Sequence, residues 1–119
     1  MDRRRTLLLA AAAAIAVPGL AIAHHGWGGF DKAKVLDHTA NVIRSAYANP
    51  HGTVVMVRDG IEITIELAPV SRMEARGLAE GDIAPGKTVR IYAYQNIGNP
   101  VVYRAEWIEP VGKKRVELR

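Results

Sequence analysis

The chain has 119 residues, no cysteine and a formal net charge of +4 at pH 7. Without cysteine it can form neither a disulfide nor a thiolate metal site, and a lipid-anchored lipoprotein is excluded. Half of the net positive charge stands at the N-terminus, so residues 24–119 carry a net charge of only +2. A charge this small, spread along the chain, argues against nucleic acid as a partner.

The first 23 residues have the order of an export signal. Three arginines at positions 3–5 precede a largely apolar run over residues 6–17, which Pro18 and Gly19 break before the small residues of positions 21–23. This order predicts a signal peptide over residues 1–23, cleaved after Ala23. A membrane anchor is the alternative, but the interrupted run falls short of the roughly 20 apolar residues that span a bilayer. We therefore expect a periplasmic or secreted protein with no membrane span after cleavage.

Two export routes fit this signal. Arg4 and Arg5, followed by one residue and then Leu7 and Leu8, match the twin-arginine pattern. An ordinary Sec signal that is rich in arginine fits equally well.

The first half of the exported chain contains three predicted strands. Residues 24–35 are predicted to be a glycine-rich leader, and residues 36–119 the folded domain. A strand over residues 39–48 should end at Asn49-Pro50, because proline lacks a backbone donor. Residues 53–57 and 61–67 predict two more strands, the second with strict alternation of apolar and polar side chains. Asp59-Gly60 between them predicts a two-residue hairpin turn, which requires positive φ angles.

The second half adds a helix and two strands. Ser71 and Glu74 have the spacing of a capping box, which predicts a short helix that starts there and ends near Gly77. After a connector over residues 78–86, strands are predicted over 87–95 and 101–108. The chain is therefore expected to be mostly β: a small five-stranded OB-like Greek-key barrel with its helix between strands 3 and 4. A small open sandwich is the competing architecture.

Three motifs stand out together along the chain. They are His24-His25-Gly26-Trp27, Asn49-Pro50-His51 and residues 67–78, Leu-Ala-Pro-Val-Ser-Arg-Met-Glu-Ala-Arg-Gly-Leu. Jointly they resemble a family of small exported bacterial proteins of unknown function, whose members begin with His-His-Gly or His-His-Ser and carry the Asn-Pro-His triplet. The resemblance implies that His24, His25 and His51 belong to a shared pattern, whereas His38 lies outside it. It implies a set of residues rather than an activity.

A histidine at the mature N-terminus is a chelator. Its α-amine and ring nitrogen bind one metal ion together, and a second imidazole completes a three-nitrogen site that suits copper. The amine loses its proton readily, because its reference pKa is about 7.7 to 8.0. Cleavage after Ala23 would make His24 the chelating residue, with His51 or His25 as the second imidazole. Cleavage before Ala23 would instead place His25 third, in a square-planar site for Cu(II) or Ni(II).

Other charged residues are predicted to have ordinary roles. Glu62 and Glu66 face the same side of a strand, where charged residues usually serve solubility. Arg72 and Arg76 lie four residues apart on one face of the predicted helix, where they could hold an anion. Salt bridges with Glu80 or Asp82 are the favoured interpretation.

These features predict a periplasmic metal-binding protein, with copper as the expected ion, that acts in binding, delivery or homeostasis rather than as an enzyme. Its partners would be the metal ion and a periplasmic or membrane protein. One alternative is a non-metal binding module that recognises a partner protein or small ligand through the OB face, with Tyr92, Tyr94, Tyr103 and Trp107 as candidate contacts. A copper-dependent redox enzyme is a third possibility.

Overall fold

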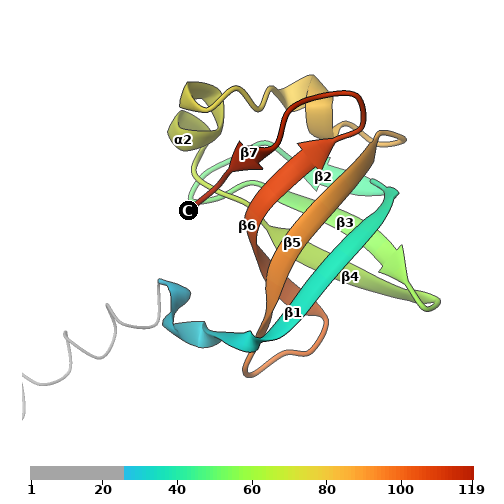
Figure 1. Ribbon diagram of the computed structural model, residues 1–119, viewed down its shortest axis with the longest axis vertical. Coiled ribbons are helices and arrows are strands. Elements are labelled where there is room, and N and C mark those ends of the chain that lie inside the picture. Colours follow the sequence, from blue (N-terminus) through green and yellow to red (C-terminus); the bar gives the residue numbers. More distant parts are fainter. Residues whose placement is uncertain (1–25) are drawn as a thin grey trace, which may run out of the picture.

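The computed structural model describes residues 26–119, which are mostly β-structure with one short α-helix (Figure 1). The elements are the 3-10 turn η1 (Trp27–Gly29), β1 (Phe30–Asn41), β2 (Arg44–Ala46), β3 (Thr53–Arg58), β4 (Ile61–Glu66), α2 (Val70–Ala75), the 3-10 turn η2 (Glu80–Ile83), β5 (Thr88–Asn96), β6 (Val102–Pro110) and β7 (Val116–Glu117). In this part of the chain no helix has the length and apolar character needed to cross a membrane. The predicted signal peptide, His24 and His25 lie outside the described residues.

The strands form one mixed sheet. Its order is β1-β5-β6-β4-β3-β2, with β7 added beside β6, and the β4–β6 pair is parallel. The seven strands, rather than the predicted five, have two sources. The predicted strand over residues 39–48 is divided at Val42-Ile43 into β1 and β2, and β7 adds a short strand near the C-terminus.

Strand β1 starts earlier than the sequence pattern indicates. It pairs with β5 from Phe30 opposite Asn96 onward, so part of the predicted leader belongs to the sheet. The register shifts between Asp31 and Val35, which leaves residues 32–34 in a bulge. Such a bulge breaks the alternation of side chains on which a sequence prediction depends.

The predicted hairpin is confirmed. Asp59 and Gly60 have φ angles of 51° and 77°, and the flanking residues Arg58 and Ile61 pair across the turn. Both turn residues therefore adopt the left-handed conformation that a two-residue hairpin needs. Further along, Ile63, Ile65 and Leu67 are buried, as the pattern predicts, whereas Ile61 beside the turn is exposed.

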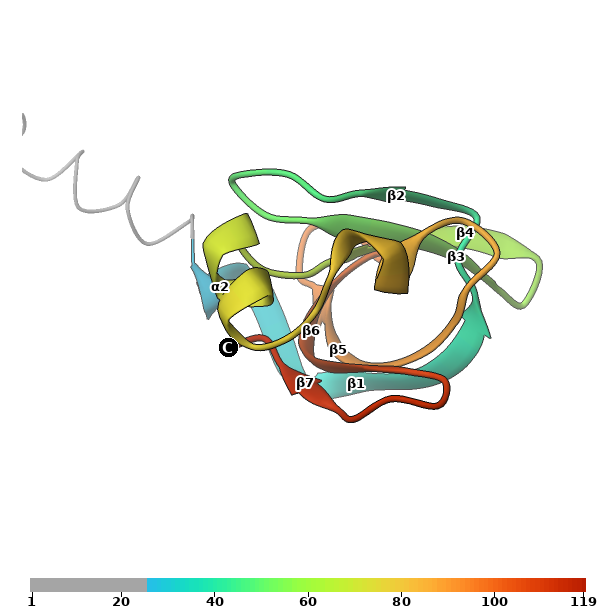
Figure 2. The ribbon, with the colours of Figure 1, turned by 90° about the horizontal axis from the view of Figure 1, so that it is seen from above.

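The two halves of the sheet enclose the core. Seen from above, β2, β3 and β4 lie on one side and β1, β5 and β6 on the other (Figure 2). The core is built from apolar residues of the strands and of the helical segment, among them Val54, Met56, Ile65, Leu67, Met73, Leu78, Ile83, Ile91 and Ile108, all with no exposed surface. Met56 and Met73 are both core residues, so neither faces a candidate metal site.

Helix α2 is capped from a distant loop. It begins at Val70, one residue before the predicted start, and no side chain of its own N-cap residue caps it. Instead the backbone N–H of Val70 donates to Oδ1 of Asn49, at 3.0 Å. The predicted capping box of Ser71 and Glu74 is therefore wrong, because Pro69 is the N-cap residue and Asn49 accepts the free backbone N–H of Val70.

The helix arginines bind the C-terminal segment. Arg72 donates to the carbonyl of Leu118 at 3.2 Å, and Arg76 donates to Glu117 O at 3.0 Å and to Arg119 O at 2.9 Å. They do not pair with the acidic residues that follow the helix, so the predicted local salt bridges are wrong. The guanidinium groups point across the fold toward β7 rather than along their own segment.

Candidate functional site

A pocket of about 570 Å³ lies where the N-terminal turn meets the sheet. Five segments line it: Gly26, Gly29 and Phe30 at the start of the described chain, Pro50 and His51 before β3, Glu66 at the end of β4 with Pro69 just after it, Asn96 at the end of β5, and Arg104 on β6. His51 and Gly26 therefore face one cavity although they are distant in sequence. Gly26 is the residue that directly follows His25.

His51 is held beside a carboxylate. Its Nε2 lies 3.4 Å from Oε1 of Glu66, and the two side chains are 30% and 21% exposed. Its Nδ1 is buried and has no hydrogen-bond partner within residues 26–119. The carboxylate therefore lies beside Nε2, while Nδ1 is enclosed by the protein. Metal-ligating imidazoles commonly have a carboxylate beside the ring.

Glu66 is a site residue that the sequence analysis missed. Glu62 and Glu66 lie on the same side of β4, and the pattern treats them alike. The structure separates them, because Glu62 pairs with Arg44 at 2.6 Å on an exposed surface, whereas Glu66 faces the pocket and His51. No local signal distinguishes them, since the difference lies in the loop that covers one end of the strand.

Trp27 anchors the chain at the edge of the pocket. Its ring lies under the guanidinium groups of Arg104 and Arg119, at 4.8 and 4.9 Å from the ring centre. It also makes edge contacts with Tyr94 and Phe30, with ring centres 6.0 and 6.4 Å apart. These contacts tie residue 27 to β5, β6 and the C-terminal residue, and they hold Gly26 beside the pocket.

Arg104 contributes a positive charge to the pocket. The side chain is half-buried, and its buried Nε finds no hydrogen-bond partner in the described part of the chain. Burial lowers the pKa of Arg104 from its usual value; the Glu66 carboxylate acts against this shift and the Arg72 guanidinium adds to it. The pocket thus combines an imidazole, a carboxylate and a guanidinium.

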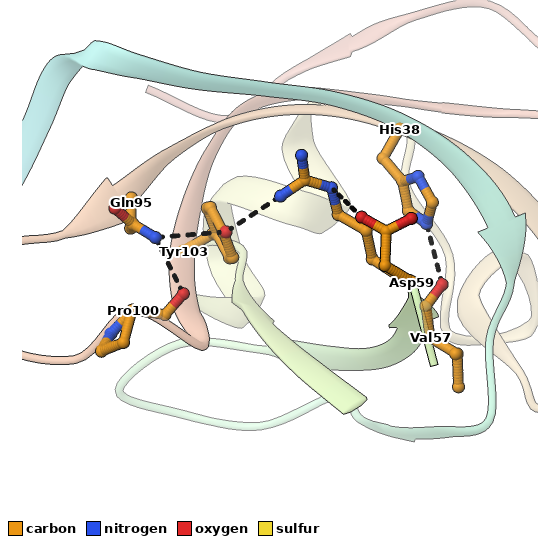
Figure 3. A network of polar contacts seen from close by, with 7 residues as sticks. His38, Val57, Asp59, Gln95, Pro100 and Tyr103 are labelled. Atoms are coloured by element: carbon orange, nitrogen blue, oxygen red, sulfur yellow. Dashed lines mark hydrogen bonds and ion pairs between the residues drawn. The ribbon is translucent and has the colours of Figure 1, made fainter. Parts of the chain in front are cut away.

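His38 belongs to a different part of the molecule (Figure 3). Its Nε2 lies 2.9 Å from the carbonyl oxygen of Val57. Close by, the hydroxyl of Tyr103 is contacted by Arg58 at 3.5 Å and by Gln95 at 3.4 Å. This network does not include any residue that lines the His51 pocket.

The aromatic rings of β5 and β6 cover one another. Tyr92 stacks on Trp107 with ring centres 5.5 Å apart, and the guanidinium of Arg115 lies 3.6 Å from the centre of the Trp107 ring. Trp107 is only 7% exposed and Tyr103 only 4%. These two candidate contacts of the predicted OB face are therefore packed by the protein's own side chains.

Within the described range, no three histidine or acidic side chains come together in a way that could hold a metal ion. His24 and His25, the other predicted ligands, lie just before the first described residue.

Together, the fold and this pocket define a small, mostly β domain in which His51 lies in a pocket beside the N-terminal turn. A family model matches residues 11–110, and the chain belongs to that family, DUF6152, a family of unknown function. The resemblance to a family without an assigned function is thereby confirmed at the level of the family. A comparison with curated proteins finds none of similar sequence.

Proposed function

We propose that this protein is exported and binds a copper ion in the periplasm through His24, His25 and His51, for binding, delivery or homeostasis. The observation that carries the proposal is the position of His51. It shares a pocket with Gly26, and the Glu66 carboxylate lies 3.4 Å from its Nε2. A periplasmic or membrane protein would receive or supply the metal.

The covalent chain supports the three-histidine arrangement. Consecutive Cα atoms are about 3.8 Å apart, so His24, two residues before Gly26, has its Cα within about 8 Å of the Gly26 Cα. Gly26 itself lines the pocket of His51. Cleavage after Ala23 would place the α-amine and ring of His24 in reach of that pocket. Three nitrogen donors of this kind suit Cu(II), which prefers tetragonal nitrogen coordination.

We further propose that the sheet is an OB-like barrel in which β1 and β2 act as one bent strand. The N–H of Val42 donates to Lys87 O, and the N–H of Ile43 donates to Val55 O, both at 2.8 Å. The segment between β1 and β2 thus bonds both to Lys87, just before β5, and to β3. Counted this way, β1/β2, β3, β4, β5 and β6 follow the OB order, with α2 between the third and fourth strands.

Copper titration of the exported chain that begins at His24 tests the metal site. Isothermal calorimetry should show one tightly bound Cu(II), and electron paramagnetic resonance a nitrogen-rich signal. One extra N-terminal glycine should abolish this site, because it separates the α-amine from the His24 ring. His51→Ala should weaken binding and remove one nitrogen from the signal, whereas His38→Ala, the matched control, should leave both unchanged.

Two outcomes would contradict the proposal. Binding that is weak, or indifferent to the added glycine and to His51→Ala, would leave a non-metal binding module as the better hypothesis. Rapid consumption of oxygen or peroxide by the copper-loaded protein with a reductant would instead favour a redox enzyme.

A further inference from the structure

The partly buried guanidinium of Arg104 has no ion-pair partner among residues 26–119. A guanidinium that is partly removed from water loses hydration, and this loss is normally offset by an anion or by carbonyl oxygens. Within residues 26–119, the buried Nε of Arg104 has no hydrogen-bond partner, and no carboxylate forms an ion pair with the group. The guanidinium lies over the face of the Trp27 ring, which provides no hydrogen-bond acceptor.

The neighbouring charges are engaged elsewhere. Glu66 pairs with Arg104 in the strand register, but its carboxylate lies 3.4 Å from His51. Glu106 lies 3.7 Å from Arg119, and Arg72 donates to a backbone carbonyl. Oε2 of Glu106 is likewise buried without a hydrogen-bond partner. Among the arginines of this cluster, Arg104 is the one with neither an ion pair nor a hydrogen bond to the described residues.

The pocket offers a second donor beside Arg104. Asn96 lines the same cavity, and its Oδ1 accepts the N–H of Gly98 at 2.9 Å. This bond identifies the other atom of the amide as the NH₂ group, which has two protons to donate. A cavity of about 570 Å³ is also within the range of small-molecule sites.

We propose that this pocket binds a small carboxylate ligand, held by the guanidinium of Arg104 with the Asn96 amide as a second donor. The planar guanidinium matches a carboxylate through two parallel hydrogen bonds. Glu66 faces the same cavity, and its negative charge disfavours a dianion such as phosphate more than a monoanion. The inference goes beyond copper binding and does not require a metal.

The test is an NMR titration of the exported protein after metal removal with EDTA, with sodium acetate replacing sodium chloride at constant ionic strength. The Nε–H signal of Arg104 and the indole N–H signal of Trp27 should shift and saturate together. The indole signal of Trp107, which does not line the pocket, should stay in place. Acetate should bind at least threefold more tightly than phosphate.

Three variants make the test specific. Arg104→Gln should weaken acetate binding at least tenfold. Arg44→Gln removes an arginine that is paired with Glu62 on the exposed surface, and it should leave binding unchanged. Asn96→Asp retains an acceptor for the Gly98 N–H but adds a negative charge, so it should weaken binding without affecting folding, even if Arg104→Gln does not fold.

The proposal is overturned if acetate gives no saturable shift, if phosphate binds more tightly, or if the folded Arg104→Gln or Asn96→Asp protein binds acetate as well as the parent. Because the protein is free of metal throughout, failure here leaves the copper proposal standing. Failure of copper binding likewise leaves the carboxylate site intact.

Discussion

The chemistry available to His51 depends on the residue beside it. The Glu66 carboxylate lies 3.4 Å from Nε2 of His51 and stands opposite Arg104 in the strand register. Its charge acts against the effect of burial on the pKa of Arg104. One acidic side chain thus stands beside both the imidazole and the guanidinium of the pocket.

Glu66→Gln should weaken Cu(II) binding by about 10- to 100-fold, the usual effect of removing a carboxylate that orients a metal-bound histidine. Competition with a chelator of known affinity would measure the change. Glu62→Gln is the matched control, because Glu62 lies on the same side of the same strand but pairs with Arg44. Equal losses in the two variants would show that Glu66 acts only through its general charge.

Asp82 is a buried carboxylate with a structural role. Burial raises its pKa, but hydrogen bonds from Lys113 and from the backbone N–H of Ala79 outweigh that effect, and the pKa falls below its ordinary value of 3.8. Asp82→Ala removes both contacts, so we expect it to lower the free energy of unfolding by about 1–2 kcal/mol at pH 7.

The pH dependence of this loss follows from the lowered pKa. A carboxyl whose pKa is lower in the folded state stabilises the fold fully above its unfolded pKa of about 3.9, and this contribution is lost as pH falls through the folded value. Denaturant unfolding of both proteins between pH 7 and pH 2 should therefore show the difference shrinking below about pH 4. A difference that stays constant down to pH 2 would argue against this ion pair.

At the scale of elements, the β3–β4 hairpin depends on local residues, whereas helix α2 depends on contacts with distant ones. The β3–β4 hairpin is determined by two adjacent residues, Asp59 and Gly60, whose positive φ angles suit the turn. Helix α2 instead receives its cap from Asn49 and directs its arginines to the C-terminal segment. The hairpin should therefore tolerate changes elsewhere in the chain better than the helix does.

Gly60→Ala should lower the free energy of unfolding by about 1 kcal/mol, because an L-residue at a φ of 77° brings its Cβ close to a carbonyl oxygen. Gly81→Ala is the control, since Gly81 does not have a positive φ and an added Cβ there meets no atom within 4 Å. Thermal and denaturant unfolding would compare the two. Equal effects would mean that the turn conformation does not limit stability.

At the scale of the whole molecule, the pocket is an assembly of distant segments. Trp27, near the start of the described chain, contacts Arg104 on β6 and Arg119 at the C-terminal end. His51 joins them from the loop before β3. The site therefore exists only when these segments are folded together.

Trp27→Ala should weaken Cu(II) binding about tenfold while leaving the core intact. Without the ring, residue 27 loses its contacts with the sheet and must be ordered when metal binds, and ordering one residue costs about 1–2 kcal/mol. Trp27→Phe keeps an aromatic ring over the arginines and should lose less. Calorimetry on the three proteins tests this, and unchanged affinity in Trp27→Ala would exclude an anchoring role.

Copper binding, export and the roles of His24 and His25 stay predictions, because those residues lie outside the described chain. The predominance of strands, the Asp59-Gly60 turn and a short helix between the third and fourth predicted strands are confirmed. The capping box of Ser71 and the local salt bridges of Arg72 and Arg76 are wrong.

What the sequence determined by itself is local. Alternating side chains along β4 and the turn that precedes it follow from interactions within a few residues, so the pattern alone predicts them. The tertiary structure alone decided that Glu66 faces His51 while Glu62 does not, that Trp27 packs under two arginines, and that the buried Nε of Arg104 has no hydrogen-bond partner among residues 26–119. Each depends on which distant strands and loops pack together, and no short segment of the chain carries that information.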